Sequence, residues 1–246
     1  MSENKLWKFL NRPASSHPST PCSYTPILLS DSKGNYLKEF LGNTVVDNKV
    51  KCWCKSGSTV EKSYYWLKAN IENKILIHGK LWIYIWLGTC NITTKEGNFI
   101  SISSEDNQAV LNITHYFQEF STLIQKYPEC KITFLEIPVF PIESFNKSRN
   151  HPDPKVFKNQ DLKLQDQIYE LNSCIRHTNS TINSHSPQFS CDLYRRSNYR
   201  RGNNHRNPAA RAFYNFYLYL DGIHPERILA QVWLRKILKQ MKTDCW

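Results

Sequence analysis

Leu81-Trp82-Ile83-Tyr84-Ile85-Trp86-Leu87 is the stretch of sequence that decides the fold of this 246-residue chain. All seven residues are apolar or aromatic. A strand with one solvated face alternates between apolar and polar residues, whereas a strand that is buried on both faces is almost continuously apolar. The stretch therefore predicts a central strand of a sheet that is covered on both sides.

Shorter apolar segments on either side of this strand alternate with segments of helical spacing. Further strands are predicted at Pro26–Leu29, Val50–Cys54, Ile132–Phe140 and Phe189–Tyr194. Helices are predicted at about 60–75, 107–126, 155–175 and 225–241, where apolar residues recur every three or four positions. Such alternation is typical of an open parallel sheet with helices on both faces. We therefore predict an α/β fold with about five strands in its central sheet.

The composition indicates one folded domain that follows a polar segment. Hydrophobic residues make up 40% of the chain, with only 8 Gly and 12 Pro, which excludes wholesale disorder and a collagen-like repeat. Residues 1–24 are polar and rich in Ser and Pro, so we expect an extended tail there and one domain over 25–246. The formal net charge of +11 favours polyanionic partners or an anionic surface.

The sequence offers no sign of a membrane span, a secretory signal or a metal site. Its longest apolar run is far shorter than the ~20 residues that a spanning helix needs, and charges interrupt the only apolar patch of the N-terminus. We therefore expect an intracellular protein, cytoplasmic or nuclear. The eight cysteines are spread evenly and are expected to be free thiols, and neither they nor the histidines have metal-ligand spacing. No cofactor is expected.

Polar and glycine-containing segments follow the predicted strands. The first three strands lead into Ser30-Asp31-Ser32, Ser56-Gly57-Ser58 and Gly88-Thr89-Cys90-Asn91, and Asp221-Gly-Ile-His224 precedes the last helix. In open parallel sheets the ligand site lies beyond the carboxyl ends of the strands. These four segments are therefore the candidate site.

The same segments contain the groups that a serine nucleophile requires. Such a nucleophile needs a base to remove its proton, an acid to orient that base, and donors for the developing oxyanion. Ser32, His224 and Asp221 can fill the first three roles, and a single turn can bring the carboxylate to the imidazole. Candidate oxyanion groups are the backbone at Gly57 and Gly88 and the carboxamide of Asn91.

Ser-Asp-Ser-x-Gly after the first strand, together with Asp-Gly-Ile-His-Pro before the last helix, resembles the SGNH/GDSL hydrolase superfamily. The resemblance spans roughly Pro26 to Leu238, with the motifs in family order. It implies a flavodoxin-like three-layer α/β fold and an activity among esterases, lipases and carbohydrate deacetylases. It also implies Ser32 as nucleophile, His224 as base and Asp221 as orienting acid, with the Ser32 N–H and Gly57 as oxyanion donors. The nucleophile elbow of α/β-hydrolases fits less well, because there the serine lies mid-chain and the Asp and His lie far apart.

Two positions depart from the family pattern. The first block has Ser30 where the family usually has glycine, and the third block has Cys90 where it usually has asparagine. A thiol is a poor oxyanion donor, and losing one donor typically costs ~10²–10³ in rate. We therefore expect a serine esterase or deacylase that acts on a small acyl ester. The alternative is a weakened or inactive SGNH-fold module that binds nucleic acid.

The alternative depends on an arginine-rich segment at about 194–211. It contains six arginines and no acidic residue: Arg195, Arg196, Arg200, Arg201, Arg206 and Arg211. Arginines interleaved with tyrosines can bind the phosphates and stack on the bases of single-stranded nucleic acid. This arrangement is similar to some animal retrotransposon proteins, in which SGNH-like domains lie beside nucleic-acid-binding segments. The segment could equally attract an anionic ester substrate to the nearby Asp221 and His224.

Overall fold

A four-stranded parallel sheet forms the centre of the computed structural model, which describes residues 3–13, 18, 20–42, 44–194 and 214–246. In the order β2-β1-β3-β6, the strands are Lys51–Cys54, Thr25–Ser30, Leu81–Trp86 and Cys130–Phe134. The predicted central strand, β3, pairs in parallel with β1 on one side and β6 on the other. Five of its six side chains are fully buried. The α/β class and the parallel sheet are confirmed.

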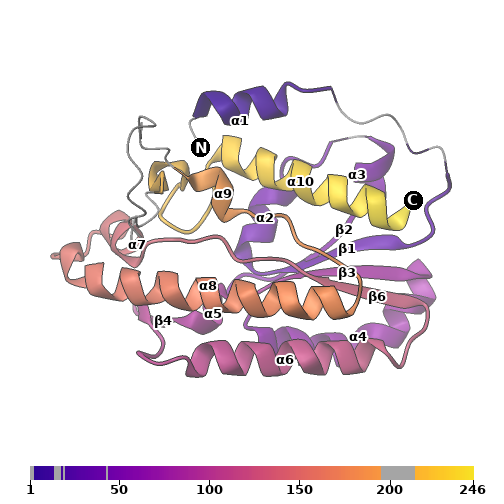
Figure 1. Cartoon of the computed structure of the whole chain (residues 1–246), viewed down its shortest axis with the longest axis horizontal. Helices are drawn as coiled ribbons and strands as arrows, with labels where there is room; N and C mark the ends of the chain where they lie inside the picture. The colour runs from indigo at the N-terminus through magenta and orange to yellow at the C-terminus, as the bar shows by residue number, and fades with distance from the viewer. Residues whose placement is uncertain (1–2, 14–17, 19, 43, 195–213) are drawn as a thin grey trace, which may run out of the picture.

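Helices cover both faces of the sheet, so the molecule has three layers (Figure 1). One outer layer contains α1 (Glu3–Leu10), α2 (Ser32–Lys38), α3 (Val45–Lys49) and α10 (Arg227–Cys245). The other contains α4 (Val60–His78), α6 (Gln108–Ile124) and α8 (Lys158–Thr181). Shorter elements connect them: α5 (Thr89–Ile92), α7 (Ile142–Ser148), α9 (Ser190–Leu193), the 3-10 turns Pro154–Phe157 and Phe216–Leu218, and an antiparallel hairpin of β4 (Thr93–Glu96) and β5 (Phe99–Ile102).

The main sheet has four strands in the described part of the chain, one fewer than predicted. The segment expected as the fifth strand instead forms the short helix α9, and Phe189 just before it is fully buried. The Phe189 ring packs against Trp86 of β3 and Trp233 of α10, with centroids 5.1 and 5.6 Å away. Burial between the sheet and α10 explains the apolar character of Phe189 without a strand.

Side chains of α8 and the segment that follows it occupy the β6 edge, where a fifth strand would pair. Asn179 accepts a hydrogen bond from the Phe134 N–H at 3.0 Å and donates to the Phe134 carbonyl at 2.7 Å. Asn172 makes the same pair of bonds with Ile137, both at 2.8 Å. Buried backbone polar groups are costly when they lack partners. The two asparagines therefore replace the ladder of another strand.

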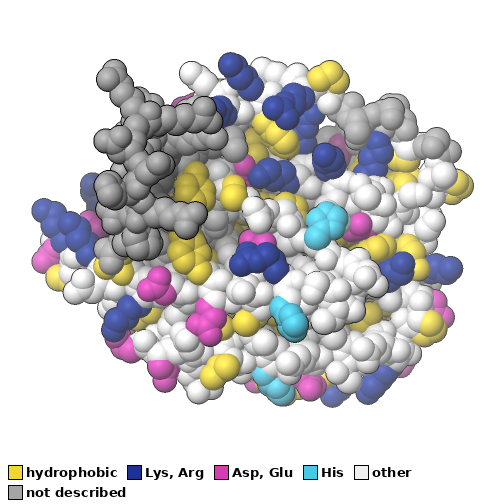
Figure 2. All heavy atoms as spheres, viewed as in Figure 1, with side chains coloured by type: hydrophobic (Ala, Val, Ile, Leu, Met, Phe, Trp, Pro, Cys, Tyr) yellow, Lys and Arg dark blue, Asp and Glu magenta, His cyan; other side chains and the backbone are white. Residues whose placement is uncertain are grey.

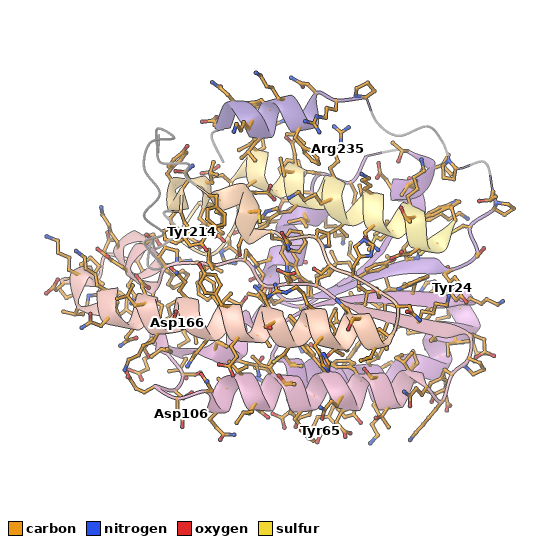
Figure 3. The ribbon with its side chains drawn as sticks, in the orientation of Figure 1. Tyr24, Tyr65, Asp106, Asp166, Tyr214 and Arg235 are labelled. Carbon is orange, nitrogen blue, oxygen red and sulfur yellow. The ribbon has the colours of Figure 1, made fainter. Side chains whose placement is uncertain are left out.

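The N-terminal segment departs from the expected extended conformation, which is wrong for residues 3–10. These residues form α1, whose Leu6 is fully buried and which packs on α10. Arg235 of α10 points toward α1 (Figure 3) and donates hydrogen bonds to the carbonyls of Leu10, Arg12 and Pro13. The Ser- and Pro-rich composition holds for residues 12–22, whereas the apolar residues before them have helical spacing and form α1.

Candidate active site

The first block of the site lies where β1 runs directly into α2. Asp31 caps the helix by accepting a hydrogen bond from the Lys33 N–H at 2.9 Å, and Ser32 is the first helical residue. The N–H at that position has no acceptor within a helix, so it remains available to a ligand. Ser30, at the position where the SGNH/GDSL pattern usually has glycine, is buried and donates from Oγ to the Trp86 carbonyl at 3.1 Å.

Gly34 allows the start of α2 to lie against the sheet. A Cβ at this position would lie 2.5 Å from Cys54 Sγ and 2.7 Å from Ser30 Cβ. Any larger residue would push the first turn of α2 away from β1 and β2. The position of Ser32 at the strand end therefore depends on this close approach.

The Asp221–His224 segment is a tight turn that is held by its own carboxylate. Asp221 Oδ1 accepts hydrogen bonds from the N–H groups of Ile223 and His224, at 3.1 and 2.9 Å. Gly222 has a φ of +93°, and a Cβ there would lie 2.6 Å from the Phe145 backbone nitrogen. The turn thus needs glycine both for its conformation and for its contact with α7.

Ser32, His224 and Asp221 are brought together in one chain of hydrogen bonds. Ser32 Oγ lies 2.8 Å from His224 Nε2, and His224 Nδ1 lies 2.8 Å from Asp221 Oδ2. The histidine and aspartate side chains are 15% and 13% exposed, so both are shielded but reachable from solvent. Serine, imidazole and carboxylate therefore have the order that general-base activation of a serine requires.

The environment of Asp221 keeps its carboxyl group ionised. Burial alone would raise the pKa of Asp221, but hydrogen bonds from the His224 ring and backbone outweigh it and lower the pKa. Arg149 adds a cation, with Nη2 at 3.5 Å from Asp221 Oδ2 and half of its side chain exposed. A carboxylate held in this state can orient the imidazole and stabilise its protonated form.

The second block supplies a backbone donor beside the first. The Lys55 N–H donates to the Ser30 carbonyl at 3.0 Å, which fixes the loop after β2 against the end of β1. Gly57 follows with a φ of +70°, and no described residue accepts a hydrogen bond from its N–H. Gly57 is therefore placed in a loop where its N–H can serve a ligand.

The third block is engaged in contacts within the protein. Asn91 Oδ1 accepts a hydrogen bond from the Val60 N–H at the start of α4, at 3.0 Å, and Thr89 Oγ1 accepts one from Lys33 Nζ at 2.6 Å. Gly88 has a φ of +132°, and a Cβ there would lie 2.4 Å from Ile137 Cδ1. Burial, with the nearby charge of Asp31, raises the pKa of the Cys90 thiol to about 11, so this group stays protonated at neutral pH.

Lys33 and Tyr36 contribute contacts that the sequence did not lead us to expect. Lys33 is only 2% exposed, and its Nζ lies 2.5 Å from Asp31 Oδ2 and 5.4 Å from the centroid of the Trp86 ring. The Tyr36 ring stacks on His224, with centroids 4.5 Å apart and an interplanar angle of 24°. Tyr36 lies four residues after Ser32 on α2, and that spacing is the signal that could have identified it. A lysine in a first helical turn gives no comparable signal.

The arginines of the predicted nucleic-acid segment, including Arg195, Arg196, Arg200 and Arg201, lie outside the described residues. Among the described side chains on the face shown in Figure 2, basic and acidic groups both occur. Within the described ranges, no cluster of three or more His, Cys, Asp or Glu side chains is arranged to hold a metal. No helix in that part of the chain has the length and apolarity to cross a membrane.

Comparison of the whole fold with solved structures finds the architecture of GDSL-like lipases and acylhydrolases. A putative acylhydrolase from Bacteroides fragilis matches with a TM-score of 0.60 at 10% identity, over 99% of this chain and 97% of that one. A GDSL-like lipase from Bacteroides thetaiotaomicron matches with a TM-score of 0.57 at 9% identity, over 98% of both chains. The acetyl xylan esterase AlAXEase matches with a TM-score of 0.52 at 13% identity, over 87% of this chain and 98% of that one.

The sequence itself matches no family model and no curated protein. At these low identities the structural matches establish the fold. The chain thus shares the fold of the SGNH/GDSL hydrolases, as its motifs predicted.

Proposed function

We propose that this protein is a serine esterase or deacylase that hydrolyses a small acyl ester through Ser32, His224 and Asp221. The observation that carries the proposal is the unbroken chain of two 2.8 Å hydrogen bonds from Ser32 Oγ through the imidazole to Asp221. The similar fold of several lipases and acylhydrolases supports an ester as the substrate class.

The reaction follows from this order of groups. His224 Nε2 accepts the Ser32 proton while Oγ attacks the acyl carbonyl carbon, and the carbonyl oxygen becomes an oxyanion. As the ester C–O bond breaks, His224 returns the proton to the leaving alcohol, and the acyl group remains on Ser32. Water then loses a proton to His224, attacks the acyl-serine and releases the acid, with the proton restored to Ser32.

The oxyanion would be met by backbone donors. The Ser32 N–H at the start of α2 and the Gly57 N–H are the candidates with no acceptor among the described residues. Gly88 and Asn91 remain candidates from the third block, although the Asn91 amide oxygen bonds to Val60. Each donor aimed at the developing charge contributes ~10²–10³ in rate in enzymes of this kind.

The test is the turnover of a chromogenic acetyl ester by the full chain and by Ser32→Ala. We expect the substitution to lower the enzymatic rate by on the order of 10³ or more, because no other group replaces the nucleophile. Ser121→Ala is a matched control, because its hydroxyl bonds within α6 and should leave turnover unchanged. Equal rates for the wild type, Ser32→Ala and the uncatalysed reaction would contradict the proposed function.

A further inference from the structure

We propose that Tyr36 is a positioning residue for His224. The Tyr36 ring holds the imidazole in place and stabilises it when it takes the proton from Ser32. The proposal deepens the proposed function and rests on it. It assigns a role in the reaction to a residue outside the Ser-His-Asp chain of hydrogen bonds.

The geometry places the Tyr36 ring against one face of the imidazole. α2 begins at Ser32, so Tyr36 lies about one helical turn further on and on the same side of the helix. His224 is therefore held at both ring nitrogens, by Ser32 and Asp221, and across its plane by Tyr36. One short helix thus carries both the nucleophile and the group that packs against its base.

The chemistry makes this contact stronger in the transition state than in the ground state. When Ser32 Oγ attacks the substrate, its proton moves to Nε2 and the neutral imidazole becomes a cation. A cation over the face of an aromatic ring within ~6 Å of its centroid is attracted by the negative π-face, whereas a neutral ring gains less. An interaction that grows as the reaction proceeds lowers the barrier and raises kcat.

Tyr36 itself stays uncharged during this step. Burial raises the pKa of its phenol above the ordinary value, and Asp221 and Glu39 raise it further while Arg149 lowers it. These three residues are the charged neighbours of the Tyr36–His224 pair. Asp221 belongs to the same loop as His224, Arg149 directly follows α7, and Glu39 directly follows α2. A neutral phenol offers its ring to the cation without a charge of its own.

Two other roles for Tyr36 make different predictions. A phenol that binds substrate through its hydroxyl would lose its function in Tyr36→Phe. A ring that merely fills space would be replaced adequately by leucine. The proposed role requires an aromatic ring and tolerates the loss of the hydroxyl.

The kinetic experiment compares Tyr36→Phe and Tyr36→Leu with the wild-type full chain on a chromogenic acetyl ester. We expect Tyr36→Phe to stay within about twofold in kcat and Tyr36→Leu to lose about 3- to 10-fold, with KM little changed in both. Tyr65→Leu is the matched control, because this exposed tyrosine of α4 lies on the other outer layer (Figure 3) and should leave kcat unchanged. An equal loss in Tyr36→Phe and Tyr36→Leu would overturn the proposal, as would a raised KM with unchanged kcat.

A spectroscopic measurement separates this proposal from the proposed function. The ring protons of His224, followed by NMR at a fixed pH, report the contact without any substrate, because a ring stacked on the imidazole displaces their resonances upfield. A loss of this displacement in Tyr36→Leu but not in Tyr36→Phe supports the stacking role, and equal chemical shifts in all three proteins contradict it. If the wild type shows no Ser32-dependent turnover, the esterase proposal fails while this measurement still decides the role of Tyr36.

Discussion

The loops after β1 and β3 lie beside each other at one edge of the sheet, but their side chains make different kinds of contact. The first ends in the half-buried Ser32, whose hydroxyl bonds to His224 and to no other side chain among the described residues. The second contains Thr89 and Asn91, whose oxygens bond to Lys33 and to the backbone of α4. The polar group of one loop bonds to the imidazole of His224, whereas the polar groups of the other bond to Lys33 and to the start of α4.

The two loops are connected by a buried ion pair. The Lys33 ammonium donates hydrogen bonds to Asp31 of the first loop and to Thr89 of the second. Burying a lysine is costly unless a carboxylate compensates it, so this arrangement couples the geometry of both loops. The comparison teaches that the third block contributes to the structure through its contacts with the first.

The largest effect is expected from removing the carboxylate that bonds to the His224 ring. Asp221→Asn should lower kcat by on the order of 10³–10⁴, because the amide no longer holds the imidazole in the required tautomer. Asp161→Asn is a matched control, since Asp161 is a half-buried carboxylate that accepts hydrogen bonds from the backbone of Ile142 and Glu143 and none from the His224 ring. A decrease of less than tenfold in Asp221→Asn would argue against the role of Asp221.

The same carboxylate predicts a stability change with pH. The folded state lowers the pKa of Asp221, so the stability it contributes is fully present above the ordinary pKa of an aspartate. That stability is lost as the pH falls through the lowered value. Denaturant unfolding of Asp221→Asn should accordingly lose less stability than the wild type between neutral pH and strongly acidic pH.

The connection between the loops is tested by Lys33→Met. Removing the ammonium leaves the Asp31 carboxylate buried without its cation, which should cost about 3–5 kcal/mol of unfolding free energy. A second change, Asp31→Asn, should recover part of this loss, because it removes the uncompensated charge. Denaturant unfolding measures both variants, and a loss below about 1 kcal/mol in Lys33→Met would contradict the structural role of the pair.

The loop after β3 is tested by Cys90→Asn, which introduces the residue that the SGNH/GDSL pattern usually has at this position. A carboxamide at this position can donate to an oxyanion, whereas the protonated thiol donates weakly. We expect kcat/KM for the acetyl ester to rise by about tenfold or more, given the ~10²–10³ that one donor contributes. Cys90→Ala supplies the comparison without a donor, and the expectation fails if the asparagine variant is no faster than the alanine variant.

The smallest effect is expected for Asn91→Ala. The Val60 N–H would lose its acceptor, which should cost about 1 kcal/mol of stability and less than tenfold in activity. Thr59→Ala removes another capping bond from the same helix end and is a matched comparison. A fall in activity of a hundredfold or more, with unchanged stability, would instead identify Asn91 as an oxyanion donor.

The sequence by itself determined the layered α/β fold and the segments that form the site. The continuous apolar run of β3 predicts its burial, and the 3.6-residue spacing predicts α4, α6, α8 and α10. Ser32 directly follows β1, and the Asp221–His224 pair lies just before α10. The carboxyl ends of parallel strands lie at the same end of the sheet, which is where an open sheet has its ligand site. These are consequences of local periodicity and of topology.

The tertiary structure alone decided which side chains pair across the chain. Phe189 has the pattern of a strand residue but packs between Trp86 and Trp233, while Asn172 and Asn179 occupy the edge where that strand would have paired. A lysine in the first turn of a helix is usually exposed to solvent, but Lys33 is buried between two loops. Such contacts join residues tens of positions apart, and no local pattern specifies them. The partner of a buried polar group comes within hydrogen-bond distance only when the layers pack together.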